Sequence, residues 1–589
     1  MFRYPLDSSE ILRKKRTLRR HLIEKENLID KKIALLSGST IGEISDILEL
    51  FLLDFGIKPT FFEGGFNRYY EDLVFNNERM VEFAPDIIYI HIGIHNITEM
   101  PKVGNSRKDT NELLKKEYDR ISHTLDSAKK YNCPVIVNNI EFPTVRELGN
   151  RDAYDTNGKI RFITKLNLML ADYADESEYV YINDINYLSG WFGLERWSDP
   201  GYYNAYKYAV SPEAIPLLCL SLSSIIKALF GKNKKALMLD LDNTLWGGTI
   251  GDDGVEGILL GEEAPKGRAY YSIQQYAKEM RGQGILLGVL SKNDEDIAKE
   301  GFTHPSSVLH EEDFSAFFAN WNEKQHNAVE AAKLLNIATD SFVFVDDNPG
   351  ERERMEQSGL DIEVVNFSLP ERLPERLSMS GYFETVALSE DDLKRADMYR
   401  ENSMRDNESR QFSDYTSFLK SLQMKVYLSG FTYERRERIT QLINKTNQFN
   451  TTTRRYTAEE IAAIGENEDV IKITARLVDK FGDNGLVSIL IASVNNNKAV
   501  IDLFVMSCRV FDRELEYVVF NELLKQASAK GVDEIEGIYI GTKKNVVIKD
   551  LYTKLGFLCT EEKEEETKYI FNLENNKCEN VDLFEVIYE

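Results

Sequence analysis

Three short apolar runs in the middle of the chain each end in polar residues. The runs span 236–239, 284–290 and 341–345. Runs of this length with helical segments between them are typical of buried parallel strands. The residues that follow them include Asp240, Ser291 and Asp346. Because the carboxyl ends of parallel strands meet at one edge of a sheet, the sequence predicts a single site that holds these side chains.

The first run leads into two carboxylates, in the segment DLDNT that begins at Asp240. Residues i and i+2 of an extended chain point to the same side, so Asp240 and Asp242 are expected to face one site. That spacing suits Asp240 as a nucleophile towards phosphorus and Asp242 as the group that gives and takes the leaving-group proton. Two solvated acids at a strand end are the ordinary alternative, and the later segments count against it.

The later segments add a hydroxyl, a lysine and two further acids. We expect Ser291 and Lys324 to stabilise the transferring oxygens. Four carboxylates this close would repel one another unless a cation joined them, and oxygen ligands beside a phosphate favour Mg²⁺. The predicted metal ligands are Asp240, Asp242, Asp346 and Asp347, with the choice between the last two left open. The predicted contacts to phosphate and substrate are Leu241, Asn243, Thr244, Ser291, Lys292, Asn293 and Lys324.

The segments DLDNT, LSKN, Lys324 and VDDNP resemble, in order, the four motifs of the haloacid dehalogenase (HAD) phosphatases. The resemblance implies a Rossmann-like parallel sheet over 231–380 and a phosphatase that works through an aspartyl phosphate. Thirty-two residues separate Ser291 from Lys324, and a glycine-rich stretch at 247–267, expected to form a β-flap, lies between the first two motifs. This spacing predicts a minimal cap and a site open to a large, tethered or protein-borne substrate.

Residues 1–230 have the strand–helix rhythm of an α/β domain with a mostly parallel sheet. Strands are expected at 32–37, 59–63 and 87–92. A helix opens directly after the first strand, at Gly38-Ser39-Thr40. This start resembles the SGNH (GDSL-like) hydrolases, with Ser39 at the place of the nucleophile and Gly65 and Asn96 near the oxyanion-hole positions.

The same region departs from the SGNH pattern where the chemistry is needed. Gly38 stands in place of an acid, and His95 stands where that family has an asparagine. A serine nucleophile needs a base, yet no histidine lies between His123 and His304, and His91 is expected to have a structural role. We therefore expect a scaffold or binding domain, with a residual esterase as the alternative.

Residues 381–422 are predicted to be a helical linker, with Ser389 and Asp392 as a capping box. Residues 423–589 then contain several strands and a helix at about 514–530, a pattern that resembles the α+β GNAT acyltransferases. Those proteins bind coenzyme A or a phosphopantetheine arm beside the helix start. Here Asp512-Arg513-Glu514 replaces their glycine-rich turn, and carboxylates at this place would oppose a pyrophosphate.

Cys508 follows the strand at 499–507, where the GNAT resemblance would bring an acyl group. Arg509 and the following helix start favour its thiolate, so a reactive thiol is one interpretation and a packed cysteine is the other. The polar segment from 444 to 455 is expected to line a pocket for a hydroxylated or phosphorylated ligand, unless it is ordinary surface. Its predicted binding residues are Asn447, Asn450 and Arg454.

Nearly the whole chain resembles the FkbH-like proteins, whose core is a HAD subfamily IIIC phosphatase. The matching stretches are LDLDNTLWGG, FVFVDDNPGERE, KTNQFNTTTRRY, VDKFGDNGLV and MSCRV. The resemblance implies Mg²⁺-dependent dephosphorylation and transfer of a glyceryl unit from 1,3-bisphosphoglycerate to the phosphopantetheine thiol of an acyl carrier protein, with Cys508 holding the thioester in between. The alternatives are a plain HAD phosphatase for a phosphorylated sugar or metabolite of surface-polysaccharide biosynthesis, and a scaffold whose flanking domains dock partners.

Length and charge narrow the class of protein further. The 589 residues suggest three or four domains, and 97 acids against 72 bases give a formal net charge of −25, which disfavours nucleic acid as a partner. The five cysteines form neither a zinc pattern nor a disulfide framework, so a reducing cytoplasm is expected. The most apolar window, 215–230, is too short and too polar for a membrane span and predicts a buried helix.

Overall fold

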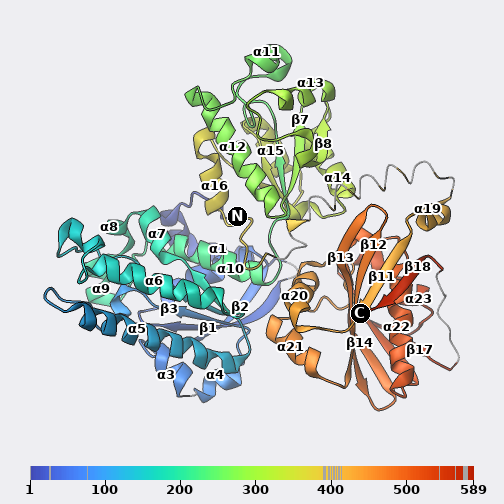
Figure 1. Ribbon diagram of the computed structural model, residues 1–589, viewed down its shortest axis with the longest axis horizontal. Coiled ribbons are helices and arrows are strands. Elements are labelled where there is room, and N and C mark those ends of the chain that lie inside the picture. The colour runs from blue at the N-terminus through green and yellow to red at the C-terminus, as the bar shows by residue number, and fades with distance from the viewer. Residues whose placement is uncertain are drawn as a thin grey trace. The chain divides into compact units, whose positions relative to one another are not determined.

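The computed structural model describes residues 2–25, 28–75, 77–388, 414–542, 544–563, 566–574 and 582–589, and positions 393, 394, 398, 401, 405, 408 and 412 (Figure 1). The chain forms two compact units, Met1–Leu229 and Phe230–Glu589. Each unit contains a five-stranded parallel sheet, and the second unit also contains an eight-stranded sheet. The mixed α/β architecture with parallel sheets that was predicted from the sequence is thereby confirmed.

The sheet of the first unit has the order β2-β1-β3-β4-β5. Its strands are β1 (Ile29–Ser37), β2 (Ile57–Glu63), β3 (Ile87–His91), β4 (Val135–Asn138) and β5 (Val180–Asn183). Every residue of β3 and β4 is buried, because helices cover both faces of a parallel sheet. Ala34, Leu36, Ile88 and Ile90 share one core cluster with apolar residues of the helices α5 (Arg107–Ala128) and α6 (Lys159–Asp175).

The helices of the first unit follow the strands in alternation. The longer ones are α1 (Ser8–Ile23), α2 (Gly42–Asp54), α5 (Arg107–Ala128), α6 (Lys159–Asp175) and α10 (Ile215–Leu229), and the shorter ones are α3 (Tyr69–Val74), α4 (Glu78–Phe83), α7 (Ile185–Phe192), α8 (Leu194–Trp197) and α9 (Pro200–Tyr206). Nearly all residues of α10 are buried, as the sequence predicts for a packed helix. Within the described ranges, no helix is both long and apolar enough to cross a membrane.

The parallel sheet of the second unit has the order β10-β9-β6-β7-β8. Its strands are β6 (Ala236–Leu239), β7 (Leu286–Ser291), β8 (Phe314–Ala319), β9 (Phe342–Val345) and β10 (Glu363–Val364). Side chains alternate between two cores, since Leu237 and Leu239 pack with α12 (Pro265–Gly282) and α16 (Leu373–Met379) while Met238 packs with α14 (Lys324–Leu334) and α15 (Pro349–Gln357). The sequence predicts β6, β7 and β9 but not the two outer strands.

The glycine-rich stretch between β6 and α12 is not the β-flap that the sequence predicts. It contains two isolated bridges, between Asp242 and Trp246 and between Gly247 and Leu259, and the second of these encloses the helix α11 (Ile250–Gly257). The carboxylate of Asp242 accepts the backbone N–H of Ile250 at 3.0 Å, which satisfies one of the donors that a helix start leaves open. Between β7 and α14 the chain forms only α13 (Glu295–Glu300), two short 3₁₀ turns and β8.

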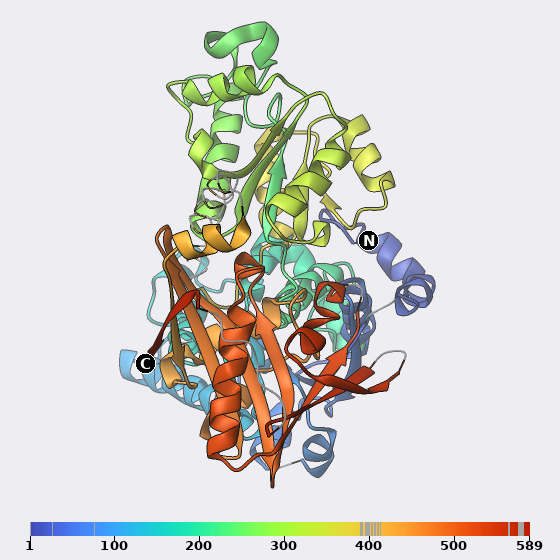
Figure 2. The same ribbon diagram turned by 90° about the vertical axis from the view of Figure 1, so that its right-hand side faces the viewer.

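The eight-stranded sheet has the order β16-β17-β15-β14-β13-β12-β11-β18. Its strands are β11 (Met424–Ser429), β12 (Val470–Asp479), β13 (Gly482–Asn495), β14 (Lys498–Met506), β15 (Glu534–Ile540), β16 (Leu558–Glu562), β17 (Glu566–Asn572) and β18 (Phe584–Tyr588). The helix α22 (Leu515–Ala529) lies across one face of this sheet and shares its main core (Figure 2). The remaining helices are α19 (Tyr415–Ser421), α20 (Arg436–Lys445), α21 (Ala458–Glu466) and α23 (Leu551–Lys554).

The parallel strands β14 and β15 pair over only four residues and then separate. The segment that contains Asn450 and Thr451 enters the gap. Thr451 donates its N–H to the carbonyl of Phe504 at 3.2 Å and accepts the N–H of Ile540 at 2.8 Å. The chain itself therefore satisfies the carbonyl of Phe504 and the N–H of Ile540 inside the gap. The predicted capping box at 389 and 392 lies outside the described residues.

Candidate functional site

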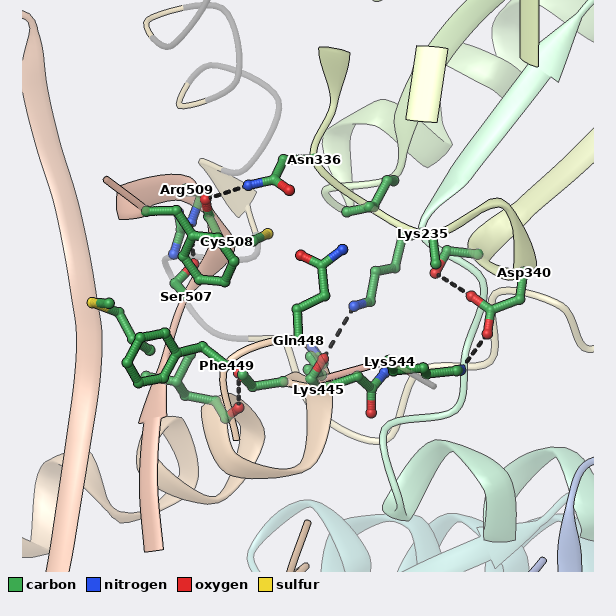
Figure 3. Close-up of a pocket in the computed structure, with 18 of the residues that line it drawn as sticks. Lys235, Asn336, Asp340, Lys445, Gln448, Phe449, Ser507, Cys508, Arg509 and Lys544 are labelled. Carbon is green, nitrogen blue, oxygen red and sulfur yellow. Dashed lines mark hydrogen bonds and ion pairs between the residues drawn. The ribbon is translucent and has the colours of Figure 1, made fainter. Parts of the chain in front are cut away.

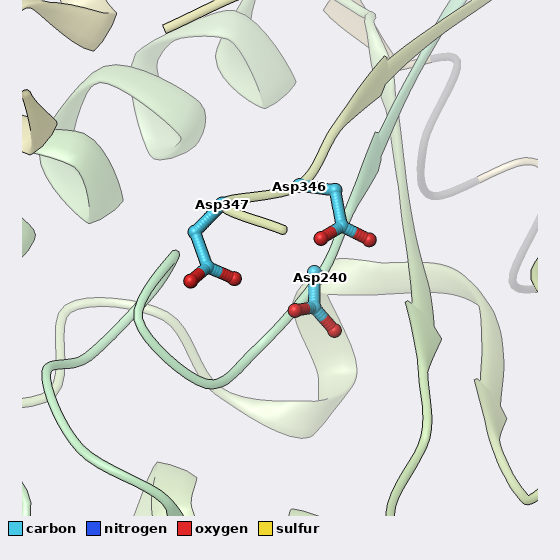
Figure 4. Close-up of side chains that lie close together, drawn as sticks. All are labelled: Asp240, Asp346 and Asp347. Atoms are coloured by element: carbon cyan, nitrogen blue, oxygen red, sulfur yellow. The ribbon is translucent and has the colours of Figure 1, made fainter. Parts of the chain in front are cut away.

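At the carboxyl ends of two central strands of the parallel sheet in the second unit, a buried lysine lies between two carboxylates (Figure 4 shows the acids). Asp240 follows β6 and Asp346 follows β9, and the two strands are neighbours. The Nζ of Lys324, at the start of α14, lies 2.7 Å from Oδ1 of Asp240 and 2.7 Å from Oδ2 of Asp346. All three side chains are nearly inaccessible to solvent, at 9%, 4% and 0% exposure for Asp240, Lys324 and Asp346.

A third acid, Asp347, completes a group that is able to hold a metal ion. Oxygen atoms of Asp240, Asp346 and Asp347 all lie within 4.8 Å of one another. Burial raises the pKa of Asp240 to about 6, against the lowering effect of Lys324, and burial also raises the pKa of Asp346 and Asp347. Three acids with one lysine leave a surplus of negative charge in a buried place. Carboxylate oxygens in this arrangement fit Mg²⁺.

The same cluster favours the charged form of Lys324, whereas burial favours the neutral form of the acids. Burial by itself would lower the pKa of its ammonium group, but the attraction of Asp240 and Asp346 outweighs burial and the pKa is raised. Lys324 is therefore charged at neutral pH. It bridges the two strand ends and supplies positive charge between their carboxylates.

Asp242 is not part of the three-acid group. Its carboxylate accepts three hydrogen bonds, from Nε1 of Trp246 at 2.9 Å, the N–H of Ile250 at 3.0 Å and Nδ2 of Asn293 at 2.9 Å. The chain turns directly after Asp240, since Leu245 donates its N–H to the carbonyl of Leu241, so the alternation of an extended strand ends there. The prediction of Asp242 as a metal ligand has no support from the geometry, and its role in proton transfer stays a prediction.

The turn after Asp240 positions backbone groups at the site. Asn243 adopts a left-handed conformation with φ of 53°, and its side-chain oxygen accepts the N–H of Gly248 at 3.0 Å. The hydroxyl of Thr244, which is fully buried, accepts the N–H of Asp347 at 3.2 Å. The side chain of Leu241 is in the core, so only its backbone N–H, which lowers the pKa of Asp240, lies at the site.

The end of β7 brings Ser291 and Asn293 into contact with these residues. Nδ2 of Asn293 lies 3.4 Å from the Ser291 hydroxyl and also donates to Asp242. Lys292 has another partner, because its Nζ lies 2.9 Å from Oε1 of Glu351, a buried carboxylate on α15. The structure thus places Ser291 and Asn293 with the predicted site, and Lys292 in an ion pair at its border.

Arg352 belongs to the site although the sequence gives no prediction for it. Its Nη1 donates to the carbonyl oxygens of Asp346 at 2.6 Å and Asp347 at 2.8 Å. One guanidinium group therefore fixes the backbone of both acids. The available signal was its spacing, because a residue one turn into the helix after VDDNP points back to the strand end.

Cys508 lines a separate cavity of about 270 Å³ in the second unit (Figure 3). The carbonyl of Cys508 accepts Nδ2 of Asn336 at 2.7 Å, which fixes the short 3₁₀ turn that it begins. The guanidinium of Arg509 is directed at the hydroxyl of Ser507, 3.1 Å from Nε, and at the sulfur of Met398. The side chain of Cys508 is partly exposed and contacts an apolar core, so the structure fits both a packed and a reactive thiol.

Only one of the three predicted binding residues of the polar segment lines this cavity. Asn447 does. Asn450 is completely buried, and its Oδ1 accepts the N–H groups of Thr452 at 3.3 Å and Thr453 at 2.8 Å, so its amide stabilises the turn that fills the gap between β14 and β15. Arg454 forms an ion pair with Asp502 at 3.2 Å. For Asn450 and Arg454 the geometry indicates structural roles, and ligand binding stays a prediction.

The acid cluster lies at the carboxyl ends of the strands of this parallel sheet, and the Cys508 cavity lies at their amino ends. Asp240 follows the carboxyl end of β6, whereas Lys235, which lines the cavity, directly precedes that strand. Five residue steps at about 3.3 Å each separate the two positions by about 16 Å. A small molecule cannot contact both places at once.

The first unit does not assemble a serine hydrolase site from its described residues. Ser39 is buried, and its hydroxyl lies 3.3 Å from that of Ser37. His91 is also buried, and its Nδ1 lies 2.9 Å from the hydroxyl of Tyr89. His95 stacks on Tyr203 with ring centroids 3.6 Å apart. His91 and His95 thus have structural partners, and the non-hydrolytic role expected for this unit stays a prediction.

Two remaining SGNH-like positions also have structural contacts. Nδ2 of Asn96 donates to the carbonyl of Gly38 at 3.0 Å, and a Cβ at Gly38 would lie within 2.5 Å of three Asn96 side-chain atoms. Gly65 lies directly against the side chain of Arg68. Whether this unit belongs to the SGNH-like class stays a prediction.

No family model matches the sequence, and no curated protein matches it. Among solved structures, the chain is similar to the N-terminal part of the protein BF1531 from Bacteroides fragilis, which contains a phosphatase domain and is in complex with Mg. The identity is 28% and the TM-score is 0.59, over 63% of this chain and 99% of that one. The similar region is longer than residues 231–380 alone, so it includes flanking sequence.

Acetyltransferase structures match a smaller part of the chain. The ribosomal-protein-S18-alanine N-acetyltransferase from Escherichia coli has 12% identity and a TM-score of 0.21, over 26% of this chain and 98% of that one. The PaiA N-acetyltransferase from Thermoplasma acidophilum, in complex with coenzyme A, has 16% identity and a TM-score of 0.20, over 25% of this chain and 99% of that one. These TM-scores are too low to carry an argument about activity.

Proposed function

We propose that the second unit is a Mg²⁺-dependent phosphatase of the HAD type that works through an aspartyl phosphate. The observation that carries the proposal is the buried group of Asp240, Asp346 and Asp347 with Lys324, at the carboxyl end of a parallel sheet. The similarity to a phosphatase-containing structure in complex with Mg supports it.

The proposed reaction has two steps at Asp240. An oxygen of Asp240 forms a bond to phosphorus while the bond between phosphorus and the leaving-group oxygen breaks, and Asp242 donates a proton to that oxygen. Water then attacks the phosphoaspartate, Asp242 takes its proton, and inorganic phosphate leaves. Lys324 and the Ser291 hydroxyl stabilise the phosphoryl oxygens in both steps. A bound Mg²⁺, held by Asp240, Asp346 and Asp347, supplies charge that lets an anionic phosphoryl group approach a carboxylate.

The held position of Asp242 supports its role in proton transfer. Three donors fix its carboxylate, and the bond from Asn293 connects it to Ser291. Because Asp242 is able to take a proton from water, it favours hydrolysis of the phosphoaspartate at Asp240 over a long-lived phosphoenzyme.

We further propose that the chain couples this phosphatase to acyl transfer. The Cys508 thiolate attacks the acyl carbon of 1,3-bisphosphoglycerate, so that a carbon–sulfur bond forms, the bond from that carbon to the phosphate oxygen breaks, and inorganic phosphate leaves. The thiol of a phosphopantetheine arm on a carrier protein then displaces the Cys508 thiolate, and the Asp240 centre hydrolyses the phosphate ester that remains on the three-carbon unit. The separation of about 16 Å between the Asp240 and Lys235 ends of β6 favours a tethered arm over direct passage between the sites. The second candidate is a plain phosphatase for a phosphorylated sugar or metabolite, and it is favoured by the closed gap between β14 and β15.

The test is intact-mass spectrometry of the full chain with Mg²⁺ and 1,3-bisphosphoglycerate, with phosphate release followed in parallel. An acyl adduct that maps to Cys508 and is absent from Cys508→Ser supports the transferase. Phosphate release from ordinary phosphomonoesters that disappears in Asp240→Asn, with no adduct on wild type, supports the plain phosphatase. If Asp240→Asn kept both the phosphate release and the acyl adduct of wild type, Asp240 would be refuted as the nucleophile.

A further inference from the structure

One tryptophan of the second unit is exposed beside the acid cluster. The side chain of Trp321 is 77% exposed, whereas Trp191 is 36% exposed and Trp197 and Trp246 are fully buried. No described residue forms a hydrogen bond or a ring contact with the Trp321 side chain. A single exposed apolar side chain is ordinary by itself, but an indole carries a large apolar area that binding would bury. The position of Trp321 in the fold decides what it contacts.

The loop that carries Trp321 joins two parts of the proposed active site. It leads from β8 to α14, which begins at Lys324. The backbone N–H of Asn320 donates to the carbonyl of Ser291 at 3.1 Å. Consecutive Cα atoms are about 3.8 Å apart, so Trp321 lies one step from a residue bonded to Ser291 and three steps from Lys324. The indole is therefore anchored at the edge of the sheet where the phosphoryl group is proposed to bind.

Side-chain hydrogen bonds hold this loop in place. Oδ1 of Asn320 accepts the N–H of Asn322 at 3.0 Å and Nδ2 of Asn327 at 2.9 Å. Asn327 is buried on α14, so the loop is tied to this helix as well as to the end of β7. The backbone of Trp321 is thereby fixed on both sides while its side chain is in solvent. An aromatic side chain on a preorganised loop loses little conformational entropy when a ligand covers it.

The leaving group is the part of a phosphate ester that comes within reach of this indole. In the proposed reaction the phosphoryl group binds at Asp240 and Lys324, and the leaving group extends outward from it. The face of an indole stacks on flat rings and on the apolar face of other rings. Asn322, which is also exposed, adds an amide that is able to bond a hydroxyl group of such a ring.

We propose that Trp321 is a specificity-determining residue of the Asp240 centre, and that its indole stacks on a ring in the leaving group. The site then prefers phosphate esters whose alcohol carries a ring, either a pyranose or an aryl group, over esters of short linear alcohols. The inference deepens the phosphatase that we propose for the second unit and rests on it. Of the two candidate functions, it favours the plain phosphatase.

The first test compares two esters of primary alcohols. Glucose 6-phosphate carries a pyranose ring and glycerol 1-phosphate has none, so the two differ in the ring while their leaving-group chemistry is similar. Loss of one stacking contact changes a rate or an affinity about tenfold. Trp321→Ala should therefore lower kcat/KM about tenfold for glucose 6-phosphate and leave it within about twofold for glycerol 1-phosphate. An equal loss for phenyl phosphate assigns the contact to any flat ring, and no loss assigns it to the pyranose.

Further substitutions separate stacking from apolar contact in general. Trp321→Tyr keeps an aromatic face and should recover most of the preference for the ring, whereas Trp321→Leu should not. Leu334→Ala is the matched control, because Leu334 is 44% exposed on α14 and lies about 15 Å along this helix from Lys324. It should change kcat/KM for neither ester.

A binding assay reads the same contact without turnover. In the Asp240→Asn protein with Mg²⁺, the emission of Trp321 is the difference from the same protein with Trp321→Phe. Acrylamide should quench this emission, because the indole is exposed. Glucose 6-phosphate should protect it from acrylamide at lower concentration than glycerol 1-phosphate.

Equal or absent losses for the two primary esters in Trp321→Ala, or equal or absent protection in the quenching assay, would overturn the inference. Phosphate release that Asp240→Asn abolishes would then leave the proposed phosphatase intact. A protein without Asp240-dependent phosphate release refutes the proposed function instead, and the quenching assay still decides whether Trp321 contacts a ring-bearing phosphate ester.

Discussion

Replacing Lys324 by methionine tests the electrostatics of the acid cluster. The change removes the cation that lies 2.7 Å from both Asp240 and Asp346 and leaves two buried carboxylates side by side. Loss of one partner from a buried ion pair costs about 3–5 kcal/mol of folding stability. Loss of a charge that stabilises a transition state lowers kcat by about 10²–10³.

Mg²⁺ should stabilise the Lys324→Met variant more than it stabilises wild type. Without Lys324, the cluster is one unit more negative, so Mg²⁺ binds more tightly and compensates for the lost cation. Mg²⁺ stabilises both proteins, so the difference that it recovers depends on the ratio of their Kd values, at about 1.4 kcal/mol for each tenfold gain in affinity. We therefore expect a lower Tm than wild type in EDTA and a smaller Tm deficit in saturating Mg²⁺.

The assay is thermal unfolding against Mg²⁺ concentration, with phosphate release measured alongside. Lys333→Met on the same helix is the matched control, since Lys333 is exposed and forms a surface ion pair with Glu330 at 2.7 Å. Activity within about threefold of wild type, or a Tm deficit that Mg²⁺ does not reduce, would contradict the proposed role of Lys324.

Three further predictions concern other parts of the chain. Arg352→Ala, which frees the carbonyls of Asp346 and Asp347, should weaken Mg²⁺ binding about tenfold or more in a calorimetric titration, and unchanged affinity would count against it. Cys508→Ser should leave Mg²⁺-dependent phosphate release from ordinary phosphomonoesters within about twofold of wild type, because Cys508 lies at the other edge of the sheet; a larger loss would connect the two sites. In the first unit, burial lowers the pKa of His91 to about 4 and raises that of Glu141 to about 7. His91 therefore makes stability fall as the pH drops from about 6.5 to 4, Glu141 makes it fall as the pH rises from about 4.5 to 7, and each effect reaches about 3 kcal/mol. The wild type should be nearly insensitive to pH between about 5 and 6.5, His91→Gln should lose stability as the pH rises, and Glu141→Gln should lose it as the pH falls. Pulse proteolysis of the full chain, read on peptides of the first unit, measures this, and parallel pH profiles of all three proteins would disprove it.

The parallel sheet of the second unit could be predicted from sequence because each central strand is a continuous apolar run. β6, β7 and β9 are buried on both faces, so hydrophobic content alone identifies them. The outer strands β8 and β10 are half-exposed or very short, and they lack this signal. Likewise, β18 pairs in parallel with β11, a contact between segments about 160 residues apart in the chain that no local pattern encodes.

The candidate site was predictable to the extent that it depends on strand ends. Asp240 and Asp346 follow β6 and β9, and Ser291 is the last residue of the neighbouring β7, so their proximity results from topology. The placement of Asp242 was not predictable in the same way. The alternation rule holds only for an extended chain, and here the backbone turns at Leu241. Asn450 shows a different limit, since its side-chain oxygen accepts the N–H groups of Thr452 and Thr453 in a local turn, and the sequence alone does not distinguish an amide that forms a turn from one that binds a ligand.

The most direct test of the account is detection of the phosphoenzyme. Protein with Asp242→Asn is mixed with Mg²⁺ and acetyl phosphate, quenched in acid, and digested for mass spectrometry of the peptide that contains Asp240. The account predicts a phosphate adduct on Asp240 that hydroxylamine removes, at higher occupancy than in wild type because hydrolysis lacks its base. No adduct on Asp240 in either protein, while wild type releases phosphate, would contradict the central claim.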